Sequence, residues 1–241
     1  SWSREIDFHC KFGVWPFQKT LDITPDGFRW CGELLPLREV SRLRWGVDQK
    51  RGGVFPKYSY AAVFGTEERE FSIKTKQKDF YENLTTRLWK AAGRRLLARL
   101  AEELASGGRR RFGSFSVGDQ GLYTVDKPLF GEASENFKPW RELEWGVYNG
   151  SLCFSAAGED KFLAGASFLW VDNVHVLRAA LELLKKLAML AEIFMLETTK
   201  TADKSLNIVH INPCALAAVS GAFYPNLIAD KIVNLHKQAF R

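Results

Sequence analysis

The residues that could do chemistry in this chain are few and lie far apart in the sequence. The four histidines, His9, His175, His210 and His236, occur in no G-x-S-x-G turn and no H-E-x-x-H helix. His175 opens an expected helix, which predicts a surface or end-cap position. His210 lies between two apolar residues, which predicts a half-buried structural role. We therefore predict no catalytic residue and interpret the chain as a protein that is not an enzyme.

Neither a metal nor a cofactor is indicated by the residues that usually hold one. The four cysteines, Cys10, Cys31, Cys153 and Cys214, form no close pair of the kind that zinc sites use. Each has apolar neighbours, so we expect buried thiols in a reducing compartment. Gly52-Gly53 lacks the Lys-Ser/Thr and the helix of a phosphate-binding loop. The acidic pairs Glu67-Glu68 and Glu159-Asp160 fall on expected hairpin tips, where carboxylates are solvated.

A cluster of basic residues is the main candidate for binding an anion. The net charge is +6, with 22 Lys and Arg against 14 Asp and Glu up to Arg111, and 12 against 14 after it. The candidate anionic-ligand residues are Arg42, Arg44, Lys50, Arg51 and Lys57. Several cations that converge near a membrane could hold a lipid headgroup, whereas solvated positive surface is the commoner meaning of such a cluster. We expect no nucleic-acid partner.

The elements that position these residues occur twice along the chain. Four short patterns recur in the same order, at offsets of 93 to 103 residues. They are Asp26-Gly27-Phe28 with Asp119-Gln120-Gly121-Leu122, Pro36-Leu37-Arg38-Glu39 with Pro139-Trp140-Arg141-Glu142, Trp45-Gly46-Val47 with Trp145-Gly146-Val147, and Gly65-Thr66-Glu67-Glu68 with Gly158-Glu159-Asp160. Because the order is kept, we infer two unequal copies of one unit.

Each copy reads as several short strands followed by one helix. Alternating apolar residues and turn residues predict the strands. In the first copy these are Lys19–Ile23, Phe28–Cys31, Val40–Val47, Tyr58–Phe64 and Glu70–Lys74. In the second they are Phe112–Val117, Gly121–Val125, Leu143–Val147, Ser151–Ala156 and Lys161–Ala166. Amphipathic spacing predicts helices over Phe80–Leu104 and from Val174 to Leu196.

This pattern resembles the pleckstrin-homology-like (PH-like) barrel. The run Leu21-Asp22-Ile23-Thr24-Pro25-Asp26-Gly27-Phe28-Arg29-Trp30, followed by Leu35-Pro36-Leu37-Arg38-Glu39-Val40, is similar to bacterial PH-like domains. The resemblance implies a mainly β fold with α (α+β): two antiparallel barrels, each capped by a C-terminal helix. It implies PH-like modules over 1–107 and 108–197. The tail over 198–241 does not belong to the repeat; its apolar spacing predicts a short strand and two helices, which are too short to fold alone and must dock. The phosphoinositide-binding members carry basic residues on the first loop, where this chain has Thr24-Pro25-Asp26-Gly27.

The second helix carries more apolar residues than capping one barrel requires. Leu183, Leu187, Leu190 and Phe194 form a second stripe beside the one that would face the barrel. They are the candidate protein-interface residues. The alternative is that this stripe is a core surface that packs against the other copy or the tail.

Together these patterns predict a non-catalytic binding or scaffolding protein that acts in protein–protein assembly, with a protein partner or by self-association. The alternative is a peripheral membrane protein that binds anionic lipid headgroups through the basic first module. A third hypothesis, an enzyme whose site forms across the two copies and the tail, lacks a recognisable nucleophile, base or metal set. No apolar run reaches the roughly 18 residues of a membrane span, and no signal peptide is evident, so we expect a cytoplasmic protein, or one peripheral at a membrane.

Overall fold

The fold is α+β and mainly strand, as the sequence predicts. We describe it from a computed structural model, which places residues 6–12, 18–50, 57–126 and 132–186. The chain divides into two compact units, Ser1–Leu183 and Leu184–Arg241. Both copies of the repeat, up to Leu183, lie in the first unit, and the division falls inside the helix described over 174–186.

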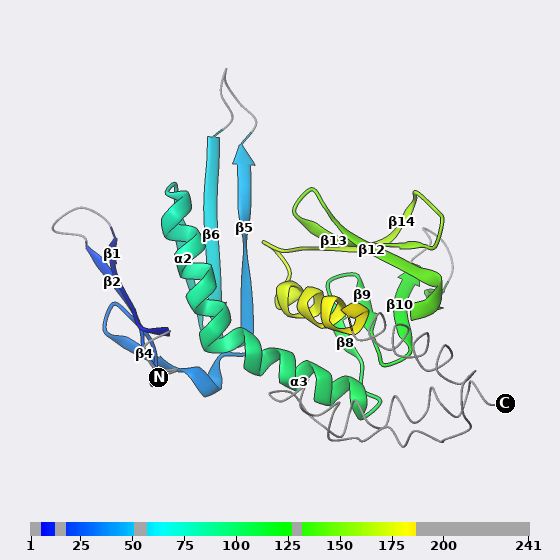
Figure 1. The fold of residues 1–241 in the computed structure, drawn as a ribbon, viewed down its shortest axis with the longest axis horizontal. Coiled ribbons are helices and arrows are strands. Elements are labelled where there is room, and N and C mark those ends of the chain that lie inside the picture. The colour runs from blue at the N-terminus through cyan, green and yellow to red at the C-terminus, as the bar shows by residue number, and fades with distance from the viewer. Residues whose placement is uncertain (1–5, 13–17, 51–56, 127–131, 187–241) are drawn as a thin grey trace, which may run out of the picture. The chain divides into compact units, whose positions relative to one another are not determined.

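The first repeat consists of two antiparallel meanders and a long helix (Figure 1). Its four-stranded sheet is β1 (Phe8–Phe12), β2 (Lys19–Ile23), β3 (Gly27–Trp30) and β4 (Glu33–Pro36), in that order. A single turn of 3-10 helix, η1 (Leu37–Glu39), leads to a three-stranded sheet of β5 (Arg42–Lys50), β6 (Lys57–Gly65) and β7 (Glu70–Thr75). Each strand pairs with the next along the chain, so every connection within a sheet is a short hairpin.

The two sheets of the first repeat face each other across a buried aromatic contact. Side chains on β2 alternate between the two faces of the sheet, which buries Leu21 and Ile23 on the same face. The ring centroids of Phe28 on β3 and Phe64 on β6 lie 4.6 Å apart. The β2–β3 turn needs Gly27, because a Cβ there would lie 2.4 Å from the carbonyl oxygen of Leu35. The Asp-Gly turn therefore allows β3 and β4 to approach closely enough to pair.

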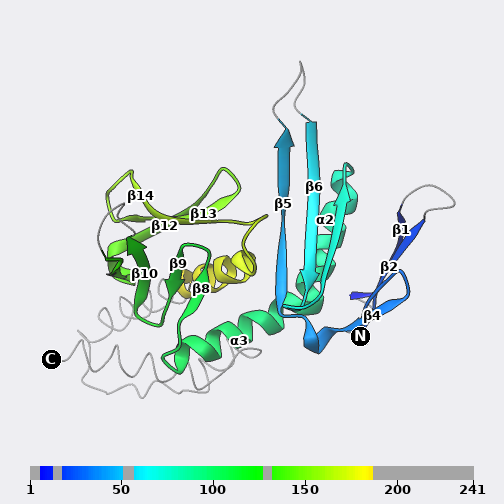
Figure 2. The ribbon, with the colours of Figure 1, turned by 180° about the vertical axis from the view of Figure 1, so that it is seen from behind.

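A helix that is continuous but for one widened turn closes the first repeat. It consists of α2 (Lys78–Leu88), a π turn η2 (Trp89–Gly93) and α3 (Arg94–Ala105). A Cβ on Gly93 would lie 2.2 Å from the Trp89 ring, so the widened turn accommodates the indole only because position 93 is glycine. In both views α2 lies along β6 (Figures 1 and 2). Phe80 contacts Phe8 on β1 and Tyr81 contacts Tyr60 on β6, so α2 touches both sheets.

The second repeat has the same order of elements. Its four-stranded sheet is β8 (Arg110–Phe112), β9 (Phe115–Val117), β10 (Gly121–Asp126) and β11 (Ser134–Pro139). A 3-10 turn, η3 (Trp140–Glu142), precedes the three-stranded sheet of β12 (Leu143–Tyr148), β13 (Ser151–Ala156) and β14 (Phe162–Ser167). The helix described over 174–186 follows. Its first turns bury Val174, Leu177 and Leu181, and Phe115 on β9 meets Phe154 on β13 at 5.3 Å.

The repeated sequence patterns correspond to repeated structure. Pro36 and Pro139 each precede the 3-10 turn that joins the two sheets of their repeat, and the backbone at both is extended. The Trp-Gly-Val patterns lie on β5 and β12, the first strands after those turns. The internal repeat is therefore confirmed at the level of element order. Among the described residues the strands form four separate sheets, and no closed barrel is seen.

Several strands differ from those predicted. The predicted strand Phe112–Val117 is two strands, β8 and β9, because Gly113 adopts a positive φ of 61° and turns the chain. β1, β4 and β11 were not predicted. Polar or exposed side chains dominate β11, which hides the alternation that would indicate a strand.

The helix Phe80–Leu104 is confirmed, with the π turn as an addition. The predicted helix from Val174 is described as far as residue 186. The rest of that helix and the predicted tail over 198–241 lie outside the described residues. No helix in the described part of the chain is both long and apolar enough to cross a bilayer.

Candidate functional site

The predicted anionic-ligand residues are only partly described. Arg42 and Arg44 lie on β5, on the same face of the sheet. Lys50 and Lys57 pair with each other at the far end of the β5–β6 hairpin, but their side chains are not described. Arg51 lies outside the described residues. The two arginines are separated from Lys50 by most of the length of β5, so the structure does not gather the five residues at one end of the hairpin.

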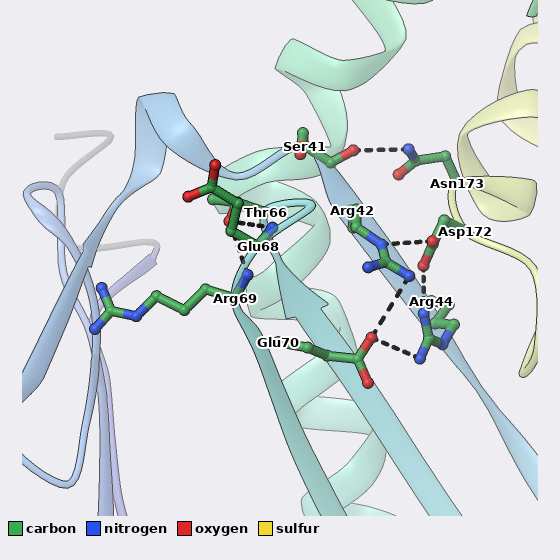
Figure 3. A network of polar contacts seen from close by, with 9 residues as sticks. All are labelled: Ser41, Arg42, Arg44, Thr66, Glu68, Arg69, Glu70, Asp172 and Asn173. Carbon is green, nitrogen blue, oxygen red and sulfur yellow. Dashed lines mark hydrogen bonds and ion pairs between the residues drawn. The ribbon is translucent and has the colours of Figure 1, made fainter.

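Arg42 and Arg44 instead enter an ion-pair network with two carboxylates (Figure 3). Arg42 Nε donates to Asp172 Oδ2 at 2.6 Å, and Arg44 Nη1 donates to Asp172 Oδ1 at 2.5 Å. Arg44 Nη2 also donates to Glu70 Oε2 at 2.8 Å, and Arg42 Nη2 lies 3.6 Å from the same oxygen. The Asp172 carboxylate thus spans both guanidinium groups, with one oxygen for each. Charge-assisted bonds of this kind are stronger than neutral ones.

Asp172 comes from the second repeat, so the network joins the two repeats. The side chain of Arg44 is 14% exposed. Burial disfavours its charge, but hydrogen bonds and charges of Asp172 and Glu70 outweigh that effect and raise the pKa of Arg44. Both arginines are paired with internal carboxylates, so an external anion would have to compete with Asp172 and Glu70.

The segment that follows β14 binds the open edge of β5. We call residues 168–173, between β14 and the following helix, the second connector. Asn173 donates its backbone N–H to the Leu43 carbonyl and its side-chain Nδ2 to the Ser41 carbonyl, each at 2.8 Å. Asn173 has a positive φ of 61°, a conformation that asparagine tolerates better than most residues. An edge strand exposes unpaired carbonyls, and here the second connector satisfies them.

His175 completes the contact with β5. Its Nε2 lies 2.8 Å from the Trp45 carbonyl oxygen, which can only accept, so Nε2 carries the proton. The imidazole is stacked between the rings of Trp45 and Phe168, with centroids 4.0 and 4.5 Å away. Burial lowers the pKa of His175 to about 4. His175 lies in the first turn of its helix, but the exposed surface position predicted for it is wrong, because the half-buried ring is stacked between Trp45 of the first repeat and Phe168 of the second.

A glycine on β5 allows the second connector to lie close to the sheet. A Cβ on Gly46 would lie 3.0 Å from the Cβ of Leu169. The equivalent residue of the second repeat is Gly146 on β12, and a Cβ there would meet nothing within 4 Å. We call the contact of Leu169, Asp172, Asn173 and His175 with β5 the joint. The joint covers the edge strand β5 of the first repeat, whereas no described residue covers β12 in the same way.

The uncovered strand, β12, lies in the part of the molecule that exposes most apolar side chains. Of the described residues, Val147 and Tyr148 on β12 and Phe162 and Leu163 on β14 are all exposed, as is Trp170 at 76%. Tyr148 and Phe162 are in ring contact, 5.5 Å between centroids. Cys153 on the intervening strand β13 is buried, and burial raises the pKa of its thiol. Exposed apolar clusters of this kind mark interaction surfaces.

The predicted protein-interface residues are described only at their first member. Leu183 lies on the helix described over 174–186 and is exposed. Leu187, Leu190 and Phe194 lie outside the described residues. The interface predicted for this helix therefore stays a prediction.

Other polar groups do not assemble into a reactive set. His9 on β1 and Asp22 on β2 form a cross-strand pair through His9 Nδ1. They line an open depression of about 440 Å³ together with Asp7, Asp26 and Arg29. In the described ranges no group of three or more His, Cys, Asp and Glu side chains could hold a metal ion.

The residues that sequence reasoning missed are Glu70, Asp172, Asn173 and His175. The sequence did contain a signal. Aligning the two Trp-Gly-Val patterns sets Arg42 and Arg44 opposite Glu142 and Glu144. A reversal of charge at two equivalent positions indicates that the two strands meet different partners.

Comparisons of the chain with protein-family models, with curated proteins and with solved structures give no match. The functional argument therefore depends on the geometry of the joint and of the exposed second repeat.

Proposed function

We propose that this chain is a non-catalytic binding or scaffolding protein in which two PH-like modules act in protein–protein assembly. The order of elements supports the PH-like interpretation. In each repeat a four-stranded meander is followed by a three-stranded meander and then by a helix. In the first repeat this helix contacts both sheets, as the capping helix of such a module would.

The observation that carries the proposal is the exposed apolar surface of the second repeat. Val147, 50% exposed, and Tyr148 lie on the edge strand β12, and Phe162 and Leu163 are exposed on β14, the other outer strand of the same sheet. Burying such side chains against a partner is favourable by about 25 cal/mol per Å². The joint supports the same interpretation, because in it a polypeptide segment binds the edge strand β5 of the first repeat.

The lipid-binding alternative is less favoured by the geometry. Two of the five basic residues predicted to hold a headgroup, Arg42 and Arg44, are paired with Asp172 and Glu70. A phosphate would have to displace carboxylates that are already hydrogen-bonded. The cytoplasmic location predicted from the sequence remains part of the proposal.

Site-specific photocrosslinking tests the proposal with a control built into the repeat. A benzophenone amino acid replaces Val147 on β12 or, as the matched control, Val47 at the equivalent position of β5, which is exposed to a similar degree. We expect protein adducts from position 147 and none above background from position 47, in the purified protein or after addition of an extract of the source cells. Absence of any adduct at position 147, or equal adducts at both positions, would overturn the proposal.

A further inference from the structure

Each side of the joint, the receiving strand and the inserting connector, has matching residues in the other repeat. On both sides the matching residues carry the opposite charge. The receiving strand of the joint carries Arg42 and Arg44 on β5. Counted from the shared Trp-Gly-Val pattern, the matching residues of the second repeat are Glu142, the last residue of η3, and Glu144 on β12. Both strands follow a 3-10 turn that begins after a proline. Val40 and Ser41 separate η1 from β5, whereas η3 leads directly into β12. The receiving side has thus changed from basic to acidic.

The inserting side has changed in the opposite direction. In the second repeat, Asn173 directly precedes the helix and Asp172 precedes Asn173. In the first repeat, Gln77 is the N-cap of α2 and Lys76 precedes it. We call residues 76–77 the first connector. An amide therefore occupies the cap position in both repeats, while the residue before it is acidic in one and basic in the other.

The acidic receiving strand is exposed in the described part of the chain, where Glu142 has one exposed ion-pair partner, Arg141, at 3.7 Å. β12 is at the edge of its sheet, paired only with β13. Its Glu144 and Gly146 are exposed, and the space above Gly146 is open. In the joint the equivalent edge of β5 is bound through the carbonyls of Ser41, Leu43 and Trp45. By repeat equivalence the matching carbonyls of the second repeat are those of Arg141, Leu143 and Trp145, and no described residue binds them.

The basic first connector is also available. Lys76 and Gln77 are both exposed, and among the described residues Lys76 makes no ion pair. The backbone N–H of Gln77 donates to the Thr75 hydroxyl, but its side chain makes no capping hydrogen bond. Lys74 and Lys78 flank it and are exposed, and Lys78 also lies 3.5 Å from Glu82. The first connector therefore has a cation, Lys76, followed by an amide donor, Gln77. The second connector has an anion, Asp172, followed by an amide donor, Asn173.

We propose that the chain self-associates head to tail, with the first connector of one copy bound to the β12 edge of the next copy. Lys76 lies between Glu142 and Glu144 of the neighbour, in the role that Asp172 has between Arg42 and Arg44 within one chain. The Gln77 amide donates to an edge carbonyl of the neighbour, as the Asn173 amide donates to the Ser41 carbonyl. This inference rests on the proposed assembly function and names a second copy as the partner. The contact uses two different surfaces, so it can repeat and build an open series of copies.

The first connector is shorter than the second and has no counterpart of Leu169. The second repeat has its own apolar side chains on that side of the sheet. Tyr148 and Phe162 lie on the same face as Gly146, as the pairing of Tyr148 with Ser151, Gly146 with Cys153 and Phe162 with Ser155 requires. The neighbour therefore needs to supply charge and hydrogen-bond donors rather than an apolar insert.

Charge reversal on each side, followed by mixing, tests the proposal. The donor variant is Lys76→Glu, the receiver variant is Glu142→Lys with Glu144→Lys, and Lys11→Glu on exposed β1 is a control with the same change of charge. Sedimentation velocity measures mass against concentration at low salt, and circular dichroism verifies folding. We expect the mass of the wild type and of the control to rise with concentration. Either reversal alone should weaken self-association more than about tenfold, because like charges then face each other.

Mixing the donor and receiver variants gives the decisive result. Each connector then meets a strand of opposite charge on the other variant, so the mixture should regain concentration-dependent growth that neither variant shows alone. A wild type of single-chain mass throughout, or self-association that Lys76→Glu leaves unchanged, would overturn the proposal. A two-fold pairing of β12 with β12 would produce that second outcome and a closed dimer. If self-association fails while position 147 still crosslinks to another protein, the proposed function survives and only this inference falls.

Discussion

The first strand after the 3-10 turn has different surroundings in the two repeats. β5 is covered along its edge by the second connector, and its two arginines are paired with carboxylates. β12 has the same position in its repeat and the same Trp-Gly-Val pattern, but its edge is uncovered in the described structure and carries Glu144, with Glu142 just before it. The comparison shows that two strands at equivalent positions have different surroundings among the described residues, since one lies in an internal joint and the other does not.

The largest expected effect is the pH dependence of the joint through His175. Its pKa is about 4 in the folded chain, below the ordinary value of 6.5. As the pH falls below about 6.5 the unfolded chain takes up a proton that the folded chain does not accept until about pH 4. Stability is therefore fully present above about pH 6.5 and is lost as the pH falls, by about 3 kcal/mol near pH 4.

The measurement is the free energy of unfolding in urea as a function of pH, for the wild type and for His175→Phe. The phenyl ring keeps the stacking with Trp45 and Phe168 but cannot titrate. As the pH falls, the free energy of unfolding of the wild type should decrease relative to that of His175→Phe, because only the wild type loses the contribution of a neutral imidazole. Parallel pH profiles would show that His175 is not buried as a neutral group at the joint.

The next effect is the loss of the carboxylate that joins the repeats. Asp172→Asn keeps the shape of the side chain but removes the charge shared by Arg42 and Arg44. Since Arg44 keeps its bond to Glu70, we expect a loss of about 2 kcal/mol, less than for a fully buried pair. The matched control is Glu144→Gln on exposed β12, which should change the stability of the monomer by less than about 0.5 kcal/mol. Equal effects in urea unfolding would contradict the difference between the strands.

The sequence predicted the features that local patterns determine, and it did not predict the contacts between residues that are far apart along the chain. The repeat, the α+β class and the helix over Phe80–Leu104 follow from local turns and periodicity, and the structure confirms them. The joint could not be derived in that way, because Asp172 meets Arg42 across 130 residues and nothing local to the arginines indicates their partner. Strand β11 was missed for a related reason. Its side chains are mostly exposed, so pairing with β10 rather than burial makes it a strand.

The smallest expected effect has opposite signs at the two equivalent glycines. Gly46→Ala places a Cβ 3.0 Å from Leu169 Cβ, so the second connector must shift by a few tenths of an ångström, at a cost of about 1 kcal/mol. Gly146→Ala meets nothing within 4 Å. Alanine also loses less backbone freedom on folding than glycine, so this change should stabilise the monomer by up to about 0.5 kcal/mol. Thermal unfolding of both variants at a concentration where the chain is monomeric measures the difference. Destabilisation by Gly146→Ala equal to that by Gly46→Ala would mean that β12 is covered within the single chain after all, and its edge would then be closed to a partner.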